Sequence, residues 1–153
     1  MPNYKGHLAG GLFFYLIALY LVLTAYSISV ATGLEWLLFT LAGSLFPDVD
    51  IKSKGQKYFY WIVAILGILL LLHNHIQAFI VLGFISFIPV LVRHRGIFHR
   101  LWFIVLAPLL ICIILCSYMP GCNRIIMFDT IFFIMGAVSH LWLDLGLKKM
   151  LRL

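Results

Sequence analysis

Short polar segments carry histidine and aspartate side chains in an otherwise apolar sequence. The segment HRGIFHR holds His94 and His99 on either side of Gly96, where a turn brings two imidazoles together. The segment FPDVD places Asp48 and Asp50 in what we expect to be extended chain, so that both carboxylates point the same way and can hold or bridge cations. Imidazole nitrogens and carboxylate oxygens are common ligands of divalent metals. Both segments could therefore supply ligands to a metal site.

Two further segments add ligands of the same kinds. SHLWLD places His140 and Asp144 four residues apart, on one face of a helix, where an imidazole nitrogen and a carboxylate oxygen can reach one ion. His7 precedes the first long apolar run and adds another imidazole. These side chains can act together only if the elements that carry them meet in space.

The composition indicates where those elements lie. The chain of 153 residues is 64% hydrophobic and 10% charged, with a mean hydropathy of +1.11. Soluble domains are about half apolar and about a quarter charged. The sequence therefore predicts a membrane protein, and its long apolar runs lack the alternating polar positions of a β-barrel. We expect an all-α fold in which residues 1–153 form a single transmembrane helical domain.

Apolar runs between polar breaks predict a polytopic bundle of about six transmembrane helices. The runs cover residues 8–31, 33–46, 58–73, 76–92, 98–119 and 127–147. The second run is only about 20 Å long at 1.5 Å per residue, whereas the hydrocarbon core is about 30 Å thick. Either its helix begins near residue 31, or the segment that follows it lies below the membrane surface. A re-entrant hairpin is the third interpretation.

The distribution of basic residues predicts the orientation. If all six runs cross, every one of the 11 lysines and arginines except Arg124 falls on the side of the N-terminus. The positive-inside rule then places both termini in the cytoplasm. The formal charge of +6 is likewise interpreted as a topology signal and as contact with anionic headgroups. Nucleic acid is not expected as a partner, since no basic domain lies outside the membrane.

This topology brings the candidate ligands to one face of the membrane. By helical rise, Asp144 and His140 lie about 6 and about 12 Å inside the boundary set by Lys148. An ionisable group at that depth is costly unless it is paired or bound to a metal. The predicted metal ligands on the cytoplasmic side are His7, Asp48, Asp50, His94, His99, His140 and Asp144.

Each segment alone has a simpler interpretation. A single histidine at a helix end is typical of the membrane interface. Asp48 and Asp50 could cap a helix or pair with Lys52 and Lys54, and Arg95 could be an ordinary positive-inside residue. These interpretations do not explain why four separate segments bring histidine and aspartate to one face. The joint metal site is the better hypothesis.

Other polar residues are interpreted structurally. His73 and His75 fall on the opposite face without a neighbouring carboxylate, and Asp129, close to Arg124, is interpreted as a helix-start or interfacial charge. The cysteines lack the CxxC spacing of a thiolate metal site and are interpreted as packing residues, although a disulfide between the last two stays open. They are Cys112, Cys116 and Cys122.

At these motifs the sequence resembles the LexA-regulated, membrane-bound metal-dependent hydrolase family of bacteria and archaea. The resemblance rests on HLAGG from His7, LFPDVD in place of LPDxD, HRGIFHR in place of HRGxTHS, and GAVSHLWLD in place of GxxSHxxLD. It covers nearly the whole chain. Phe98 replaces a threonine and Arg100 a serine, changes that could alter the fit of a substrate while leaving the ligands intact.

The resemblance implies an enzyme of the inner, cytoplasmic membrane that is distantly similar to zinc-dependent phospholipases C. We expect it to hydrolyse a phosphoester of a phospholipid or polyprenyl phosphate at the cytoplasmic leaflet, through water activated by two or more divalent ions. Mixed histidine and carboxylate ligands favour Zn²⁺ or Mn²⁺ over Ca²⁺. The expected catalytic residues are Asp50, His94, as a further ligand or a general base, and Arg95, which would clamp a phosphate oxygen.

Two other functions use the same side chains. A divalent-cation or proton transporter would need polar residues that continue across the membrane, and the six runs hold few. A metal-stabilised membrane scaffold without catalysis would have no open coordination position. The oligomeric state stays open.

Overall fold

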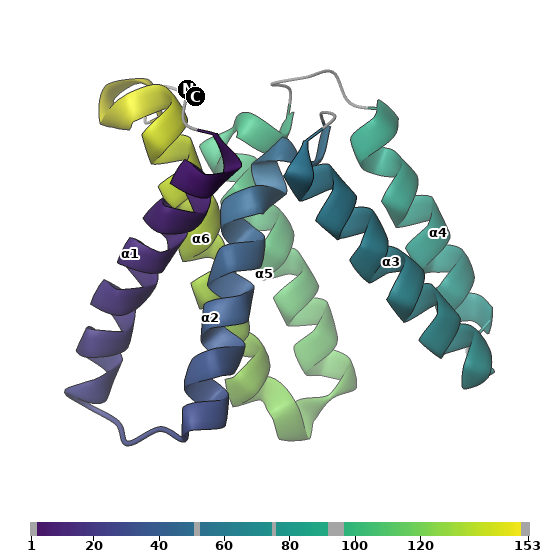
Figure 1. The fold of residues 1–153 in the computed structure, drawn as a ribbon. Helices are drawn as coiled ribbons and strands as arrows, with labels where there is room; N and C mark the ends of the chain where they lie inside the picture. Colours follow the sequence, from purple (N-terminus) through teal and green to yellow (C-terminus); the bar gives the residue numbers. More distant parts are fainter. Residues whose placement is uncertain (1–2, 51–52, 75, 92–96, 151–153) are drawn as a thin grey trace.

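The fold of this protein is a bundle of membrane helices, described by a computed structural model over residues 3–50, 53–74, 76–91 and 97–150 (Figure 1). The α-helices are α1 (Tyr4–Leu23), α2 (Val30–Leu45), α3 (Lys54–Leu72), α4 (Ile76–Leu91), α5 (Leu101–Tyr118) and α6 (Asn123–Met150). Short 3-10 helices follow α2, precede α5 and precede α6; they are η1 (Phe46–Asp50), η2 (Ile97–His99) and η3 (Pro120–Cys122). The predicted all-α class is confirmed, and the described residues include no strand.

Polar caps decide where the first helices begin and end. The prediction of one span over residues 8–31 is wrong, because α1 ends at Leu23 and Ser29 begins a new helix. The Ser29 hydroxyl accepts a hydrogen bond from the backbone N–H of Thr32 at 3.1 Å, which satisfies one of the unpaired donors at the start of α2. Asn3 caps α1 in the same way. An apolar run alone does not reveal such a break.

The second span is long enough to cross the membrane because its helical segment is longer than predicted at both ends. It starts at Val30 and continues through η1, so that the candidate span Val30–Val49 has 20 residues. The prediction that FPDVD is extended is wrong. Pro47 occupies the second position of η1, where its missing N–H costs nothing, and the chain keeps turning.

Among the described residues, five helical segments are long and apolar enough to cross a membrane. They are α1, α2 with η1, α3, α5 and α6. Helix α4 has 16 residues, with Pro89 inside it. The polytopic bundle is thus confirmed, and the inward orientation of both termini stays a prediction.

The helices form two groups (Figure 1). Helix α2 packs against α1 and α6, and α5 packs against α6. Helices α3 and α4 form a hairpin that meets the rest of the chain mainly at η1. Figure 1 shows both chain ends at the end of the bundle where η1 and η2 lie, with the α1–α2 connection and η3 at the opposite end.

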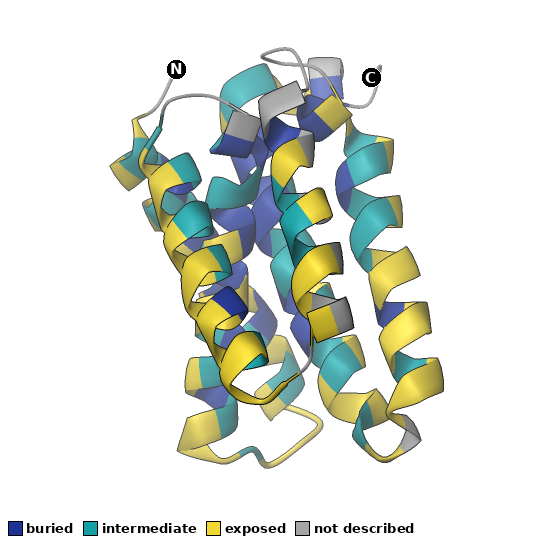
Figure 2. Cartoon of the chain, turned by 90° about the vertical axis from the view of Figure 1, so that its right-hand side faces the viewer, coloured by how far each residue is buried: buried dark blue, intermediate teal, exposed yellow. Residues whose placement is uncertain are grey.

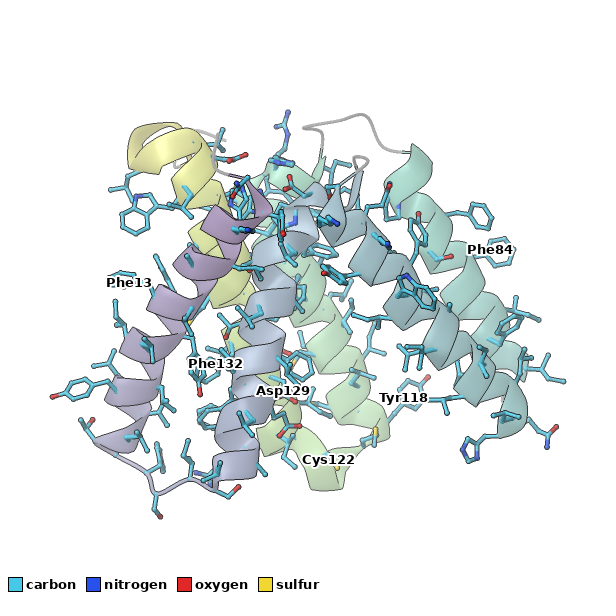
Figure 3. The ribbon with its side chains drawn as sticks, in the orientation of Figure 1. Phe13, Phe84, Tyr118, Cys122, Asp129 and Phe132 are labelled. Atoms are coloured by element: carbon cyan, nitrogen blue, oxygen red, sulfur yellow. The ribbon has the colours of Figure 1, made fainter. Side chains whose placement is uncertain are left out.

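The surface of the bundle is apolar, as expected in lipid. Phe13 and Phe84 are 56% and 75% exposed and point away from the bundle on opposite sides (Figure 3). Figure 2 shows exposed residues along the outward sides of the helices and buried residues between them. One core cluster joins Tyr15, Trp36 and Phe132. Because lipid does not push apolar side chains together as water does, close packing must hold the helices.

That close packing is tightest where α2 crosses α6. A methyl group added to Gly136 would overlap the carbonyl oxygen of Thr40, and one added to Gly43 would overlap the carbonyl oxygen of Phe133. Small residues at a crossing let two helix backbones approach each other, a common feature of membrane helix pairs. The crossing brings Ser44 of α2 against His140 of α6.

The regular part of α6 ends at a glycine. Gly146 has φ of 68°, a left-handed conformation that side-chain-bearing residues rarely adopt. The chain therefore kinks directly after Leu145, so that Asp144, a predicted ligand, lies at the end of the straight helix.

We expect Gly136→Ala to destabilise the protein. The new methyl group would overlap a backbone oxygen of α2, and such overpacking costs about 1–3 kcal/mol. Denaturant unfolding of the purified protein in detergent, followed by circular dichroism, measures the change in unfolding free energy.

Gly83→Ala is the matched control, because a methyl group there meets no atom within 4 Å. It should leave stability unchanged or slightly raised, since alanine favours helix. Equal stability of the two variants would contradict the close α2–α6 crossing.

Candidate metal centre

Five of the predicted ligands meet where the ends of several helices converge. His7 lies in the first turn of α1. Asp48 belongs to η1, and His99 ends η2. His140 and Asp144 lie one turn apart on α6. The structure thus brings together side chains that are up to 137 residues apart in the sequence, from His7 to Asp144.

One group of ligands contains His7, His140 and Asp144. Nε2 of His7 lies 3.4 Å from Oδ1 of Asp144, and Nε2 of His140 lies 3.9 Å from Oδ2 of the same carboxylate. The rings of the two histidines stack with centroids 3.7 Å apart and planes 13° apart. Their parallel rings direct two imidazole nitrogens toward one carboxylate.

A second group contains Asp48, His99 and His140. Oδ1 of Asp48 lies 3.5 Å from Nε2 of His140 and 3.8 Å from Nε2 of His99. Two ligand atoms about 2.0 Å from one tetrahedral ion lie about 3.3 Å apart. The ligand atoms of each group, all within 4.8 Å of one another, therefore need only small shifts to share an ion.

His140 belongs to both groups, and its orientation is fixed by the backbone of α2. Its Nδ1 lies 2.7 Å from the carbonyl oxygen of Ser44. A carbonyl oxygen only accepts, so Nδ1 carries the proton and donates it, which leaves the lone pair of Nε2 directed at the two aspartates. Metal-binding histidines are commonly held by a hydrogen bond of this kind.

The cluster is buried. His7, His99 and His140 are 2%, 4% and 0% exposed, and the side chain of Asp144 is 2% exposed. Among the described residues, Nε2 of His140 and Oδ1 of Asp144 make no hydrogen bond. Burying polar atoms without such partners costs free energy. A divalent ion would satisfy both atoms, so this donor set fits Zn²⁺ or Mn²⁺.

Three predicted site residues stay untested. His94 and Arg95 lie outside the described residues. The backbone of Asp50 closes η1, and its side chain is likewise outside the described part of the chain. Their proposed roles remain predictions. His73 ends α3 as an exposed residue and belongs to neither group of ligands.

Asp129 does not mark the start of a helix, because α6 begins at Asn123 and has no acidic residue in its first turn. Asp129 is 8% exposed, and it lines an apolar groove between α2, α5 and α6. Arg124, its predicted neighbour, instead lies with its guanidinium 5.2 Å from the ring centroid of Tyr26. Cys112, Cys116 and Cys122 form no disulfide with one another, and Sγ of Cys112 lies 4.0 Å from Sγ of Cys116.

Two features near the cluster have no signal in the sequence. One is the Ser44 carbonyl oxygen that orients His140, because a backbone acceptor is available at every residue. The other is an aromatic wall in which Phe46 packs edge-to-face against Phe98 and Phe133, with ring centroids 5.4 and 5.3 Å apart. Phe98 directly precedes His99, so this wall adjoins the ligands.

The fold and this cluster define a class of protein, a polytopic helical membrane protein with a buried histidine and aspartate site that could hold a metal ion. Within that class, the chain belongs to the family described as YdjM inner membrane protein, whose model matches residues 1–150. The family supports the predicted membrane location and agrees with the membrane part of the resemblance found in the motifs. Comparison with curated proteins and with solved structures gives no match.

We expect the purified protein to bind about two divalent ions per chain, the usual content of a site with two groups of ligands. His140→Ala should lower this content by about one ion, because the ion held by Nε2 of His140 loses that ligand. Plasma mass spectrometry of protein incubated with Zn²⁺ or Mn²⁺ and then desalted measures the content.

His73→Ala removes an exposed imidazole outside the cluster and should leave the metal content unchanged. Asp144→Asn keeps the size of the side chain and serves as a second test if His140→Ala does not fold. Wild-type metal content in both cluster variants would rule out the site.

Proposed function

We propose that this protein is a metal-dependent hydrolase that cleaves a phosphoester of a membrane lipid, a phospholipid or a polyprenyl phosphate. The observation that carries the proposal is the position of His140, whose Nε2 joins two groups of three potential ligands. Sites with two divalent ions are common in enzymes that hydrolyse phosphoesters.

The number of ligands favours two ions that share one cluster. Because Nε2 of His140 can bind only one ion, three of the five described side chains would hold one ion and the other two would hold the second. Three protein ligands with one open position are typical of catalytic zinc sites. Divalent ions bound here would supply a nucleophile near neutral pH and stabilise the charge that develops on a phosphoryl group. The predicted ligands Asp50 and His94 would complete the second set.

The side chains have separate roles in this proposal. His7 and Asp144 hold one side of the cluster, and Asp48 with His99 holds the other. The Ser44 carbonyl oxygen keeps the His140 ring in place. Arg95 would bind a phosphate oxygen, for which a planar guanidinium is well suited.

An apolar groove beside the cluster supports a lipid as substrate. The groove has a volume of about 360 Å³. It is lined by Phe39, Phe46, Ala107, Pro108, Ile111, Leu115, Ile126, Asp129, Thr130 and Phe133. Phe46 lies two residues before Asp48 and packs against Phe98, so the groove reaches the aromatic wall that adjoins the ligands. A lipid chain in the groove would present its headgroup to the cluster.

Transport of an ion is a weaker interpretation. Buried hydroxyls do occur between α2 and α6, but they donate to carbonyl oxygens of their own helices. The pairs are Thr40 to Trp36, Ser44 to Leu41 and Ser139 to Gly136. Hydroxyls engaged in this way do not offer a polar route through the described part of the bundle.

We expect Asp48→Asn to lower the rate of lipid phosphoester hydrolysis at least about 100-fold, since even loss of a side chain that only supports a metal ligand costs about 10–100-fold. The assay supplies metal-loaded protein with phospholipids and prenyl phosphates in mixed micelles and measures released phosphate or headgroup.

His73→Gln changes an exposed side chain that belongs to neither group of ligands and should retain hydrolysis. Metal flux into proteoliposomes without hydrolysis would favour the transporter instead. Metal binding with neither activity would favour the scaffold.

Filling the groove provides a test of the lipid substrate. Ala107→Trp should lower kcat/KM for a long-chain substrate about tenfold, because the indole would fill the part of the groove that the acyl chain occupies. This loss corresponds to about 1.4 kcal/mol of transition-state stabilisation. Hydrolysis of a short-chain, water-soluble phosphoester should not change.

Ala64→Trp is the control, because Ala64 is an exposed residue of α3 away from the groove. Equal loss on short and long substrates in Ala107→Trp would indicate general damage and contradict a chain-binding role for the groove.

A further inference from the structure

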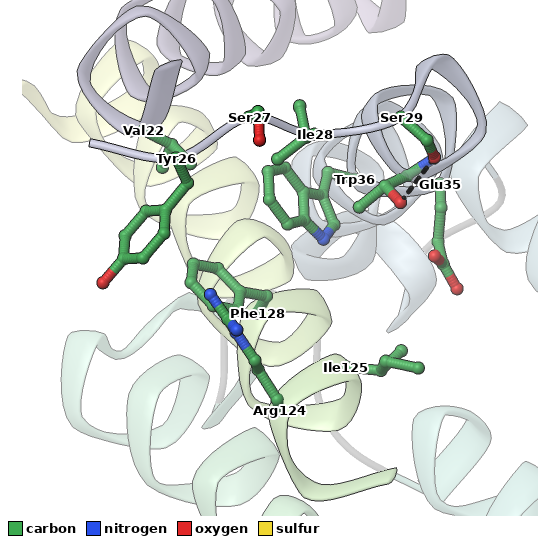
Figure 4. A pocket seen from close by; sticks show the side chains of 11 residues that line it. Val22, Tyr26, Ser27, Ile28, Ser29, Glu35, Trp36, Arg124, Ile125 and Phe128 are labelled. Atoms are coloured by element: carbon green, nitrogen blue, oxygen red, sulfur yellow. Dashed lines mark hydrogen bonds between the residues drawn. The ribbon is translucent and has the colours of Figure 1, made fainter. Parts of the chain in front are cut away.

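A second cavity lies at the end of the bundle opposite to the metal centre (Figure 4). Its volume is about 270 Å³, and it is lined by the connection between α1 and α2 and by the first two turns of α2 and α6. Its lining includes Tyr26, Ser29, Glu35, Trp36, Arg124 and Phe128. Neither the metal centre nor the lipid groove explains this combination of charged and aromatic side chains.

The cavity has one positive and one negative side chain on its wall. Arg124 comes from the second position of α6, and Glu35 comes from α2. The ion pairs of the described residues all lie in the metal centre, so these two charges do not pair with each other within 4.0 Å. Two opposite charges held apart on one cavity are complementary to a ligand that carries both signs.

The positive end suits a phosphate. The guanidinium of Arg124 is positioned by the ring of Tyr26, 5.2 Å from its centroid, and can donate two parallel hydrogen bonds to an oxyanion. Helices α2 and α6 both begin at this cavity, and helix N-termini carry partial positive charge that favours an anion.

The negative end suits a primary ammonium group. Glu35 is partly exposed and can accept hydrogen bonds from an N–H donor. A quaternary ammonium group would instead need open aromatic faces. Trp36 is 4% exposed and stacks with Phe128 and Phe132 at 5.0 and 4.7 Å, while Arg124 covers the face of Tyr26.

We propose that this cavity binds phosphoethanolamine, with the phosphate on Arg124 and the ammonium group on Glu35. The ligand can be the headgroup of a phospholipid or the free compound. Val22, Ile28 and Ile125 also line the cavity and would contact the glycerol end of a lipid. The site is independent of the metal centre and of the hydrolase proposal.

Native mass spectrometry of the full chain in detergent tests the proposal. The protein is mixed with phosphatidylethanolamine, phosphatidylcholine or phosphatidylglycerol that have the same acyl chains, and bound lipid is counted. We expect about tenfold tighter retention of phosphatidylethanolamine, since its ammonium group can donate charge-assisted hydrogen bonds to Glu35 and the other two headgroups cannot.

Two variants separate the roles of the charges. Glu35→Gln should abolish the preference for phosphatidylethanolamine over phosphatidylcholine, whereas Arg124→Gln should weaken retention of all three lipids. Lys57→Gln neutralises an exposed basic residue in the first turn of α3, away from the cavity, and should behave as wild type. Circular dichroism confirms that each variant is folded.

Competition by free phosphoethanolamine decides the source of the ligand. Displacement of the lipid by the free compound would show that the headgroup alone binds, and failure to displace it would assign the site to the lipid. Equal retention of the three lipids by wild-type protein, an unchanged preference in Glu35→Gln, or unchanged retention in Arg124→Gln would overturn the proposal.

Discussion

The hydrogen bond between Nδ1 of His140 and the carbonyl oxygen of Ser44 is the interaction on which the rest of the site depends. It forms because α2 and α6 approach closely enough for Gly43 and Gly136 to have no room for a side chain. It also fixes which ring nitrogen is free to bind a metal ion. The packing of α2 against α6 therefore also determines the geometry of the site. If the two helices separated, the His140 ring would turn away from both aspartates.

The same constraint explains why the polar residues collect at the helix ends. A buried carboxylate in the hydrocarbon region is costly, and Asp48 and Asp144 each lie within reach of imidazole nitrogens that can share a cation with them. The kink at Gly146 and the tight turn of η1 let these side chains meet where the regular helices stop. At the other end of the bundle, the N-termini of α2 and α6 create a different environment that favours anions.

The motifs predicted which side chains lie together better than they predicted the shape of the elements. SHLWLD was sufficient for His140 and Asp144, because the four-residue spacing of a helix is regular. FPDVD was predicted to be extended and is helical, since a proline after a helix can either end it or begin a tighter turn. Asp129 was interpreted as a helix-start or interfacial charge, but it is buried beyond the first turn of α6, because a sequence does not show which side of a helix faces its neighbours.

The sequence by itself determined that this chain is a helical membrane protein and which residue types could bind a metal, because hydropathy and helical spacing are local properties. Only the tertiary structure decided that His7, Asp48 and His99 join the α6 pair, because contacts between distant segments depend on how helices cross. It also decided that Arg124 and Glu35 share one cavity, a relation between two helices that no spacing within either one contains.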